Sequence, residues 1–443
     1  MKREQWTPTR ILAAGFAGII LIGAVLLALP VSSRSGESIP LLNAIFTSTS
    51  ATCVTGLVVY DTWTQFSFFG QAVLLILIQV GGLGFITAVI AIFMLTNRRI
   101  GLRQRLLLAE SVGDGQLSGV VRMSRRILSG TALFEGCGAA LLASRFVPEF
   151  GWGRGLWFSL FHSVSAFCNA GFDLMGVLSP YSSLTRFDDD PVVVLTIALL
   201  IILGGVGFIV WNDLVEAHRE RRALQLHTLV TLLATAVLLA AGTLAMLLFE
   251  WNGTLSGMSF GKKLLNAFFH AVTPRTAGFN TVDIAAMTDA GKALTVLLMF
   301  IGAAPGGTGG GVKVTTFAVV LLSACASLAG REDTSVGRRR LEEKLVRGAF
   351  CSMSVYLGMT TLGILVLCSQ SVRFADAVFE CFSAIGTVGL SVGITASLNV
   401  VSKIVLILLM YAGRVGSLTV FLAMRRRSGS FKLKNPIGKV IVG

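Results

Sequence analysis

The chain has 443 residues, of which 54% are hydrophobic and only 14% are charged, and its mean hydropathy is +0.78. Because an average soluble protein has about 25% charged residues, the composition excludes a soluble globular fold and indicates an integral membrane protein. The net charge of +14 does not indicate nucleic-acid binding, because the basic residues gather at a few places between apolar stretches.

Apolar stretches of about 20 residues, long enough to cross a bilayer core of about 30 Å, recur along the chain. They are residues 11–29, 73–95, 192–210, 229–249, 355–368 with its apolar flanks, and 400–424. The first follows Lys2, Arg3 and Arg10, as in a signal peptide. It is longer than the usual apolar region of about 7–15 residues in such peptides, so we interpret it as the first membrane span.

Four short segments between these stretches resemble one another. They are AIFTSTSATCVTGL (44–57), SLFHSVSAFCNAGF (159–172), NAFFHAVTPRTAGF (266–279) and AVFECFSAIGTVGL (377–390). Each has a phenylalanine ten residues before a glycine, and these glycines are Gly56, Gly171, Gly278 and Gly389. A period of this kind is the signature of internal repeats. We predict four repeats of span, short helix, glycine loop and span, at residues 1–122, 123–226, 227–343 and 344–443.

The basic residues predict the orientation of the chain. Of 37 Lys and Arg, 25 lie in residues 2–10, 98–126, 219–222, 331–347 and 425–439. Basic loops stay on the cytoplasmic side, so both termini and the three linkers are predicted to be cytoplasmic. The short apolar segments cannot cross and must enter from outside. The predicted fold is all-α, with eight transmembrane helices and four re-entrant pore helices around a central pore.

The glycine loops are candidates for a selectivity filter. Non-helical backbone at membrane depth is tolerated where it lines a pore, and its carbonyls can replace the water shell of a cation. The negative ends of the short helices favour a cation at the same place. We predict a filter for potassium or a close monovalent relative, made of Cys53, Val54, Thr55, Gly56, Cys168, Asn169, Ala170, Gly171, Arg275, Thr276, Ala277, Gly278, Gly386, Thr387, Val388 and Gly389. One ring glycine per loop predicts weaker discrimination against sodium than in a potassium channel with two.

The second span of the third repeat contains GAAPGGTGGG (302–311). Six glycines and one proline disfavour a helix there by roughly 9 kcal/mol. We therefore predict a break in the membrane and a mobile loop that gates the pore, with a simple kink as the alternative. A phosphate-binding loop is not indicated, because no Gly-Lys-Ser/Thr follows. The predicted gate residues are Gly302, Pro305, Gly306, Gly307, Thr308, Gly309, Gly310 and Gly311, together with Arg414.

Three cationic side chains lie within the apolar part of the sequence. Arg414 is in the middle of the last span, where a charge is costly and functional by default, so we predict an electrostatic barrier. Lys313 is nearer the cytoplasmic end and is expected to extend toward the interface. Arg275 is expected to face away from the pore and to pair with a carboxylate such as Asp283 or Glu380.

The sequence resembles the TrkH/KtrB/HKT superfamily of potassium transporters over essentially its whole length. The resemblance rests on the four repeats, the glycine-rich break at 302–311, Arg414, and the motifs TCVTGLVVYDT (52–62), FCNAGFDLMG (167–176), PRTAGFNTVD (274–283) and GTVGLSVG (386–393). Eight spans with no additional helix pair before the first repeat are most similar to the KtrB branch.

The resemblance implies a homodimer with one pore per subunit, on a ring of KtrA-like cytoplasmic regulatory subunits that bind nucleotide. It also implies that the glycine-rich loop is the gate and that Arg414 forms part of its barrier. The predicted function is potassium uptake across the cell membrane, with potassium or sodium as the transported ion, no covalent cofactor and no nucleic-acid partner. The basic loops are expected to contact membrane lipid.

Three alternatives to this function differ in the residues that they require. A sodium-preferring or sodium-coupled transporter of the same fold remains open. A secondary antiporter would require carboxylates within the spans, where the sequence offers little beyond Glu135. An enzyme or pump subunit is not indicated, because the sequence has no nucleophile–base set, nucleotide motif or metal-ligand set.

Overall fold

The computed structural model describes residues 8–84, 120–331, 333–337 and 339–416. Within these ranges the regular structure is helical except for one hairpin of β1 (Ser335–Val336) and β2 (Arg339–Arg340). The prediction of a helical membrane protein is confirmed. The predicted end of the second span, most of the linker that follows it, and the basic tail lie outside the described residues.

Four helices in the described part of the chain are each long and apolar enough to cross a membrane. In their most apolar windows only 17% to 28% of the residues are buried inside the protein. Most of their apolar surface therefore faces outward, as it does in helices surrounded by lipid. The four are α1 (Pro8–Ala28), α7 (Val120–Phe150), α11 (Leu226–Glu250) and α15 (Glu343–Ser369).

A short helix follows each of these long helices. The short helices are α2 (Leu41–Thr52), α8 (Trp152–Phe167), α12 (Phe260–Val272) and α16 (Phe374–Gly386). Their C-terminal turns are buried, and each leads into a predicted glycine loop. Phe46, Phe161 and Phe379, each ten residues before its glycine, are buried. In the third unit the buried ring is Phe269, nine residues before its glycine, rather than Phe268.

A second helix leaves each glycine loop. These helices are α4 (Phe68–Leu83), α9 (Pro191–Val206), α13 (Asp289–Phe300) and α17 (Val400–Val415). Three of them end at a related sequence, 81–84 (GGLG), 204–207 (GGVG) and 413–416 (GRVG). The first glycine of each packs against a backbone carbonyl near the C-terminus of the short helix, where a side chain would collide. The chain then turns, and α9 and α10 (Phe208–Glu220) are bent by 87°.

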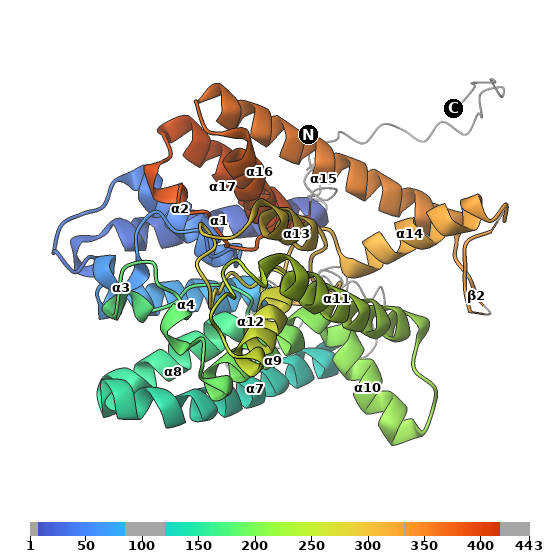
Figure 1. The fold of residues 1–443 in the computed structure, drawn as a ribbon, viewed down its shortest axis with the longest axis horizontal. Helices are drawn as coiled ribbons and strands as arrows, with labels where there is room; N and C mark the ends of the chain where they lie inside the picture. The colour runs from blue at the N-terminus through green and yellow to red at the C-terminus, as the bar shows by residue number, and fades with distance from the viewer. Residues whose placement is uncertain (1–7, 85–119, 332, 338, 417–443) are drawn as a thin grey trace, which may run out of the picture.

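The predicted break in the span after residue 293 is confirmed. α13 ends at Phe300, and α14 (Val314–Leu328) begins after the loop 301–313. The base of this loop is closed by a hydrogen bond of 2.8 Å from the Gly302 N–H to the Val312 carbonyl. Beyond the loop, α14, the β-hairpin and the start of α15 extend away from the other helices (Figure 1).

Candidate ion pathway

The four glycine segments, residues 53–56, 168–171, 275–278 and 386–389, meet in a closed ring. A Cβ atom added to any of the four glycines would lie 2.6 Å or less from the carbonyl oxygen of the residue before the next glycine. The contacts follow the chain order, from Gly56 to Ala170, from Gly171 to Ala277, from Gly278 to Val388 and from Gly389 to Thr55. The structure thus brings together all four of the glycine positions found in the sequence.

The four segments share one backbone conformation although their sequences differ. The ring glycines have φ values from +69° to +95°, and the residues two positions earlier have φ values from +50° to +71°. Those earlier residues are Val54, Asn169, Thr276 and Thr387. A side chain at a ring position would be strained by this φ and would also collide with a carbonyl. The ring therefore requires glycine.

Hydroxyl side chains near the ends of the short helices hold the segments. Ser50 and Ser383 accept hydrogen bonds of 3.1 Å from the N–H groups of their ring glycines. Ser165 and Thr273 instead donate, at 2.7 Å and 2.6 Å, to the carbonyl of the residue after the ring glycine. These four residues were not predicted from the sequence. Their signal is a serine six residues before the glycine in three segments and a threonine five residues before it in the other.

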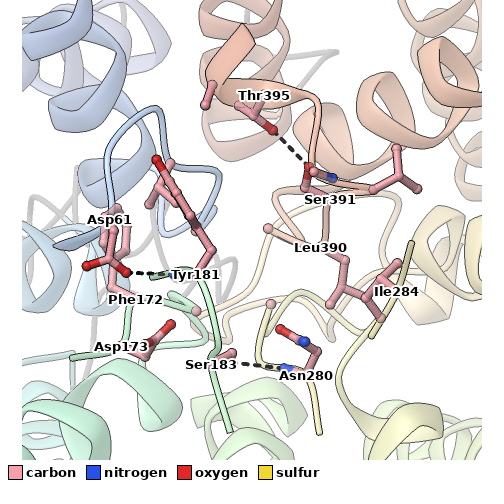
Figure 2. Close-up of a pocket in the computed structure, with 18 of the residues that line it drawn as sticks. Asp61, Phe172, Asp173, Tyr181, Ser183, Asn280, Ile284, Leu390, Ser391 and Thr395 are labelled. Atoms are coloured by element: carbon pink, nitrogen blue, oxygen red, sulfur yellow. Dashed lines mark hydrogen bonds between the residues drawn. The ribbon is translucent and has the colours of Figure 1, made fainter. Parts of the chain in front are cut away.

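On one side the ring opens into a cavity of about 300 Å³, which Figure 2 shows in close-up. The ring glycines and the carboxylates Asp61, Asp173 and Asp283 line it, without a lysine or arginine from the described ranges. Asp61 is the N-cap of α3 (Thr62–Gln65) and accepts a hydrogen bond of 2.8 Å from the Thr64 N–H. It also accepts one of 3.0 Å from the Tyr181 N–H. A cavity with one sign of charge concentrates ions of the opposite sign. This mouth therefore favours cations.

The loop 301–313 covers the other side of the ring. Gly309 and Gly310 pass so close to the side chains of Thr276 and Thr387 that an added Cβ would collide with their hydroxyl groups. Thr308 is fully buried, and its hydroxyl donates to the last carbonyl of α8 at 3.1 Å. The glycines of the loop therefore permit a close approach to the ring as well as a break in the helix.

Arg414 connects this loop to the end of α4. Its guanidinium donates to the Thr308 carbonyl and to the carbonyls of Gly81 and Gly82, the latter at 3.0 Å. Arg414 occupies the second position of GRVG, where the ends of α4 and α9 have glycine. The Arg414 side chain thus connects the end of α17 to the loop and to the end of α4.

Lys313 does not extend toward the interface, so that expectation was wrong. Its Nζ donates to the Gly309 carbonyl at 2.7 Å. The reason is local geometry, since Lys313 is the N-cap of α14 and the last residue of the loop, whose Gly309 carbonyl is within reach of its Nζ. The lysine therefore stabilises the loop in its position against the ring.

Arg275 faces away from the ring, as expected, but the predicted carboxylate partner was wrong. Its Nη2 donates to the Thr235 hydroxyl on α11 at 3.2 Å. Asp283 instead accepts from the Ala285 N–H at 2.9 Å, and Glu380 accepts from the Thr395 hydroxyl at 3.0 Å. Asp283 is thus held by a donor two residues away, and Glu380 by a donor in the segment that follows its own ring glycine.

Glu135 lies behind the second glycine segment. It is 8% exposed and accepts a hydrogen bond of 3.1 Å from Gln79 Nε2, while its Oε1 is 3.9 Å from the Cys168 sulfur. It does not line the acidic cavity. The carboxylate therefore supports the packing around the ring instead of opening a second route for ions.

Apolar helices around a ring of backbone carbonyls with an acidic mouth define a membrane cation transport protein. A family model, TrkH, described as a cation transport protein, matches residues 7–433. The chain therefore belongs to the TrkH family, whose members are membrane transporters and not enzymes. The resemblance found in the sequence is confirmed.

The chain is similar along its full length to known transporters. It is 39% identical over 449 residues to the potassium/sodium uptake protein NtpJ of Enterococcus hirae, covering 100% of this chain and 98% of that protein. It is 40% identical over 446 residues to the Ktr system potassium uptake protein B of Bacillus subtilis, with the same coverage of 100% and 98%. The crystal structure of the potassium transporter TrkH from Vibrio parahaemolyticus has the same fold, with a TM-score of 0.73 at 19% identity over 96% of this chain and 86% of that one.

Proposed function

We propose that this chain is the membrane subunit of a potassium uptake system and that the glycine ring is its selectivity filter. The observation that carries the proposal is the close approach of each ring glycine to the carbonyl oxygen of the residue that precedes the next ring glycine. Carbonyls arranged around an axis can replace the hydration shell of a monovalent cation. The acidic cavity supplies cations to the ring, and the buried hydroxyls of Thr52, Thr55 and Thr387, which have no partner within the described residues, are free to bind water or an ion.

The proposed architecture has eight transmembrane helices and four re-entrant helices in four repeats, at residues 1–122, 123–226, 227–343 and 344–443. It is supported by the order of long helix, short helix, glycine segment and second helix. The basic loops support a cytoplasmic location for both termini. The acidic cavity then opens to the outside of the cell membrane.

The loop 301–313 and Arg414 are proposed to form the gate. The loop lies against the cytoplasmic side of the ring, and Lys313 and Arg414 hold it there through backbone carbonyls. A positive charge below the filter also raises the energy of a passing cation. In this proposal the structure represents a closed state, and opening requires the loop and the guanidinium to move together.

The proposed partners are a second copy of this chain and a KtrA-like ring of nucleotide-binding regulatory subunits. The similarity to Ktr system proteins supports a regulatory partner. The natural attachment surface is the cytoplasmic one, where the basic linkers are predicted. The same basic residues are proposed to contact anionic lipid.

A sodium-preferring or sodium-coupled transporter is the second candidate. The name of the Enterococcus relative includes both ions, and a single ring glycine per segment provides few ion positions. Uptake of potassium and of sodium by cells that lack their own potassium transporters would separate the two candidates. Growth on low potassium with this chain and its regulatory partner supports potassium uptake, and sodium-only accumulation would contradict it.

Replacing Lys313 by methionine is expected to raise the maximal uptake rate roughly two- to fivefold. The change removes a hydrogen bond from a charged donor, of the kind worth about 1.5–3 kcal/mol, that holds the loop below the ring. Initial uptake rates at equal membrane levels measure the effect. Lys344→Met, on the exposed start of α15, is the matched control, and lower uptake in Lys313→Met alone would contradict a restraining role.

Uptake is expected to depend on external pH through Asp173. Burial and the nearby Asp61 charge raise the pKa of Asp173 to about 7, although its hydrogen bond from the Met175 N–H opposes the shift. A raised pKa means that this carboxylate is charged at pH 8 and neutral at pH 6. The KM for potassium is therefore expected to rise about two- to threefold between pH 8 and pH 6, the size that a modest loss of surface attraction gives.

Asp173→Asn tests this assignment, because the variant is neutral at every pH. It is expected to show the higher KM throughout and to lose the change between pH 8 and pH 6. Asp283→Asn, an exposed carboxylate on the rim of the same cavity, serves as the control and should retain the change. An unaltered pH profile in Asp173→Asn would assign the titration to another group.

A further inference from the structure

A positive charge lies behind the third glycine segment without a neutralising partner. Arg275 is only 7% exposed. Its Nη2 donates a hydrogen bond to the Thr235 hydroxyl, but its Nε has no hydrogen-bond partner among the described residues. None of the ion pairs found in those residues includes it. A guanidinium does not lose its proton in proteins, so this charge is permanent.

The other three segments have neutral residues at the same place. Three positions before the ring glycine they have Cys53, Cys168 and Gly386, and the third segment has Arg275. The backbone of Arg275 belongs to the ring assembly, because its carbonyl accepts a hydrogen bond of 3.3 Å from Asn169 Nδ2 in the second segment. The charge thus belongs to a residue of the ring assembly, although its guanidinium points away from the ring toward α11.

The surroundings of the guanidinium do little to screen it. A cavity of about 10 Å³ beside Arg275, room for a single water molecule, is lined otherwise by Ile201, Ile202, Gly205, Val272 and Ala303. These residues offer no charged group. In such an apolar environment the field of a charge extends further than it does in water.

The charge opposes the short helix that precedes it. α12 ends at Val272, three residues before Arg275, and a helix C-terminus carries roughly half a negative charge. That end would attract a cation in the ring, as the ends of α2, α8 and α16 do. One full positive charge beside it exceeds the attraction. The first, second and fourth segments therefore attract a cation in the ring, whereas the third segment repels it.

We propose that Arg275 sets the affinity of the ring for its ion, weakening binding so that the ion is released quickly. This inference rests on the proposed function of the ring as a filter. It follows from the general requirement that a conducted ion bind strongly enough to enter and weakly enough to leave. Arg275 does not touch the ion. It acts through the electrostatic potential of the third segment.

The test separates the effect of the Arg275 charge on potassium binding from the effect of its hydrogen bond to Thr235. Arg275→Met removes the charge and preserves the length of the side chain, Arg275→Lys retains the charge, and Thr235→Val removes the acceptor but leaves Arg275 charged. Potassium affinity is measured on the purified full-length protein from the rise of Tm with potassium chloride, with choline chloride keeping the ionic strength constant. Uptake by the same variants gives KM and Vmax.

Arg275→Met is expected to bind potassium roughly tenfold more tightly, the effect of one charge about 10 Å away at an effective dielectric near 20. Its uptake is expected to show a lower KM together with a lower Vmax. Arg275→Lys and Thr235→Val should bind potassium like the unaltered protein. A purely structural role would reduce Vmax without tightening potassium binding.

Potassium binding that is unchanged or weaker in folded Arg275→Met overturns the inference. If that variant does not fold, Arg275→Gln, which keeps a donor toward Thr235, is measured in the same way. Loss of folding in both neutral variants, with a native Arg275→Lys, would make the residue structural and would also overturn the inference. The filter proposal fails separately, if potassium does not raise the Tm of the unaltered protein more than choline does.

Discussion

Gly56→Ser is expected to abolish high-affinity potassium uptake while the protein still reaches the membrane. The φ of Gly56 is +95°, and an added Cβ would lie 2.6 Å from the Ala170 carbonyl oxygen. Strain of about 1–3 kcal/mol at such a position corresponds to a loss of roughly 5- to 150-fold in ion affinity. Displacement of the carbonyl also alters ion spacing, so the preference for potassium over sodium should fall. The same result is expected for Gly171→Ser and Gly389→Ser.

A matched control separates backbone strain from the ring. Gly257 also has a positive φ, of +74°, but has open space where its Cβ would be. Gly257→Ser therefore introduces similar strain in the loop between α11 and α12 and should leave the potassium-to-sodium uptake ratio unchanged. The filter assignment would be refuted by a normal ion ratio in all three ring variants at normal membrane levels.

The helical order and the broken span were predictable because their causes are local. A run of about 20 apolar residues needs no knowledge of its neighbours to be recognised as a span. The glycines and proline of 302–311 disfavour a helix wherever they lie. The endings of α4, α9 and α17 were not predicted, because GGLG, GGVG and GRVG matter only where a helix packs against the carbonyl of another element.

The ring was predictable from the period of its glycines, whereas its supports were not. Ser50 and Ser383 act through hydrogen bonds to a backbone that folds back on the helix, and serine is common enough that its spacing alone attracts no notice. The error at Arg275 has a different cause. Charge alone favours a carboxylate partner, but Asp283 and Glu380 accept hydrogen bonds from the Ala285 N–H and the Thr395 hydroxyl, and Arg275 donates to Thr235 instead.

Arg414→Ala is expected to raise the uptake rate roughly five- to tenfold, and Arg414→Lys to remain close to the unaltered protein. At an effective dielectric near 20, two unit charges about 6 Å apart repel each other by roughly 3 kcal/mol. Removing the charge lowers this barrier, and water that enters the space recovers part of the difference. The change also releases the Thr308 carbonyl and the end of α4, which the guanidinium joins.

Shortening the loop within residues 306–311 is expected to raise uptake by a similar factor, because Gly309 and Gly310 lie directly against the ring.

The decisive experiment combines the shortened loop with Arg414→Ala. Since the guanidinium is bound to the loop, the two changes remove one barrier, and their combined effect should be smaller than the product of the separate factors. Uptake rates of the four proteins at equal membrane levels measure this coupling. A double variant whose rate equals that product would show two independent obstacles, and a fall in uptake on shortening the loop would leave it as a simple kink in the span.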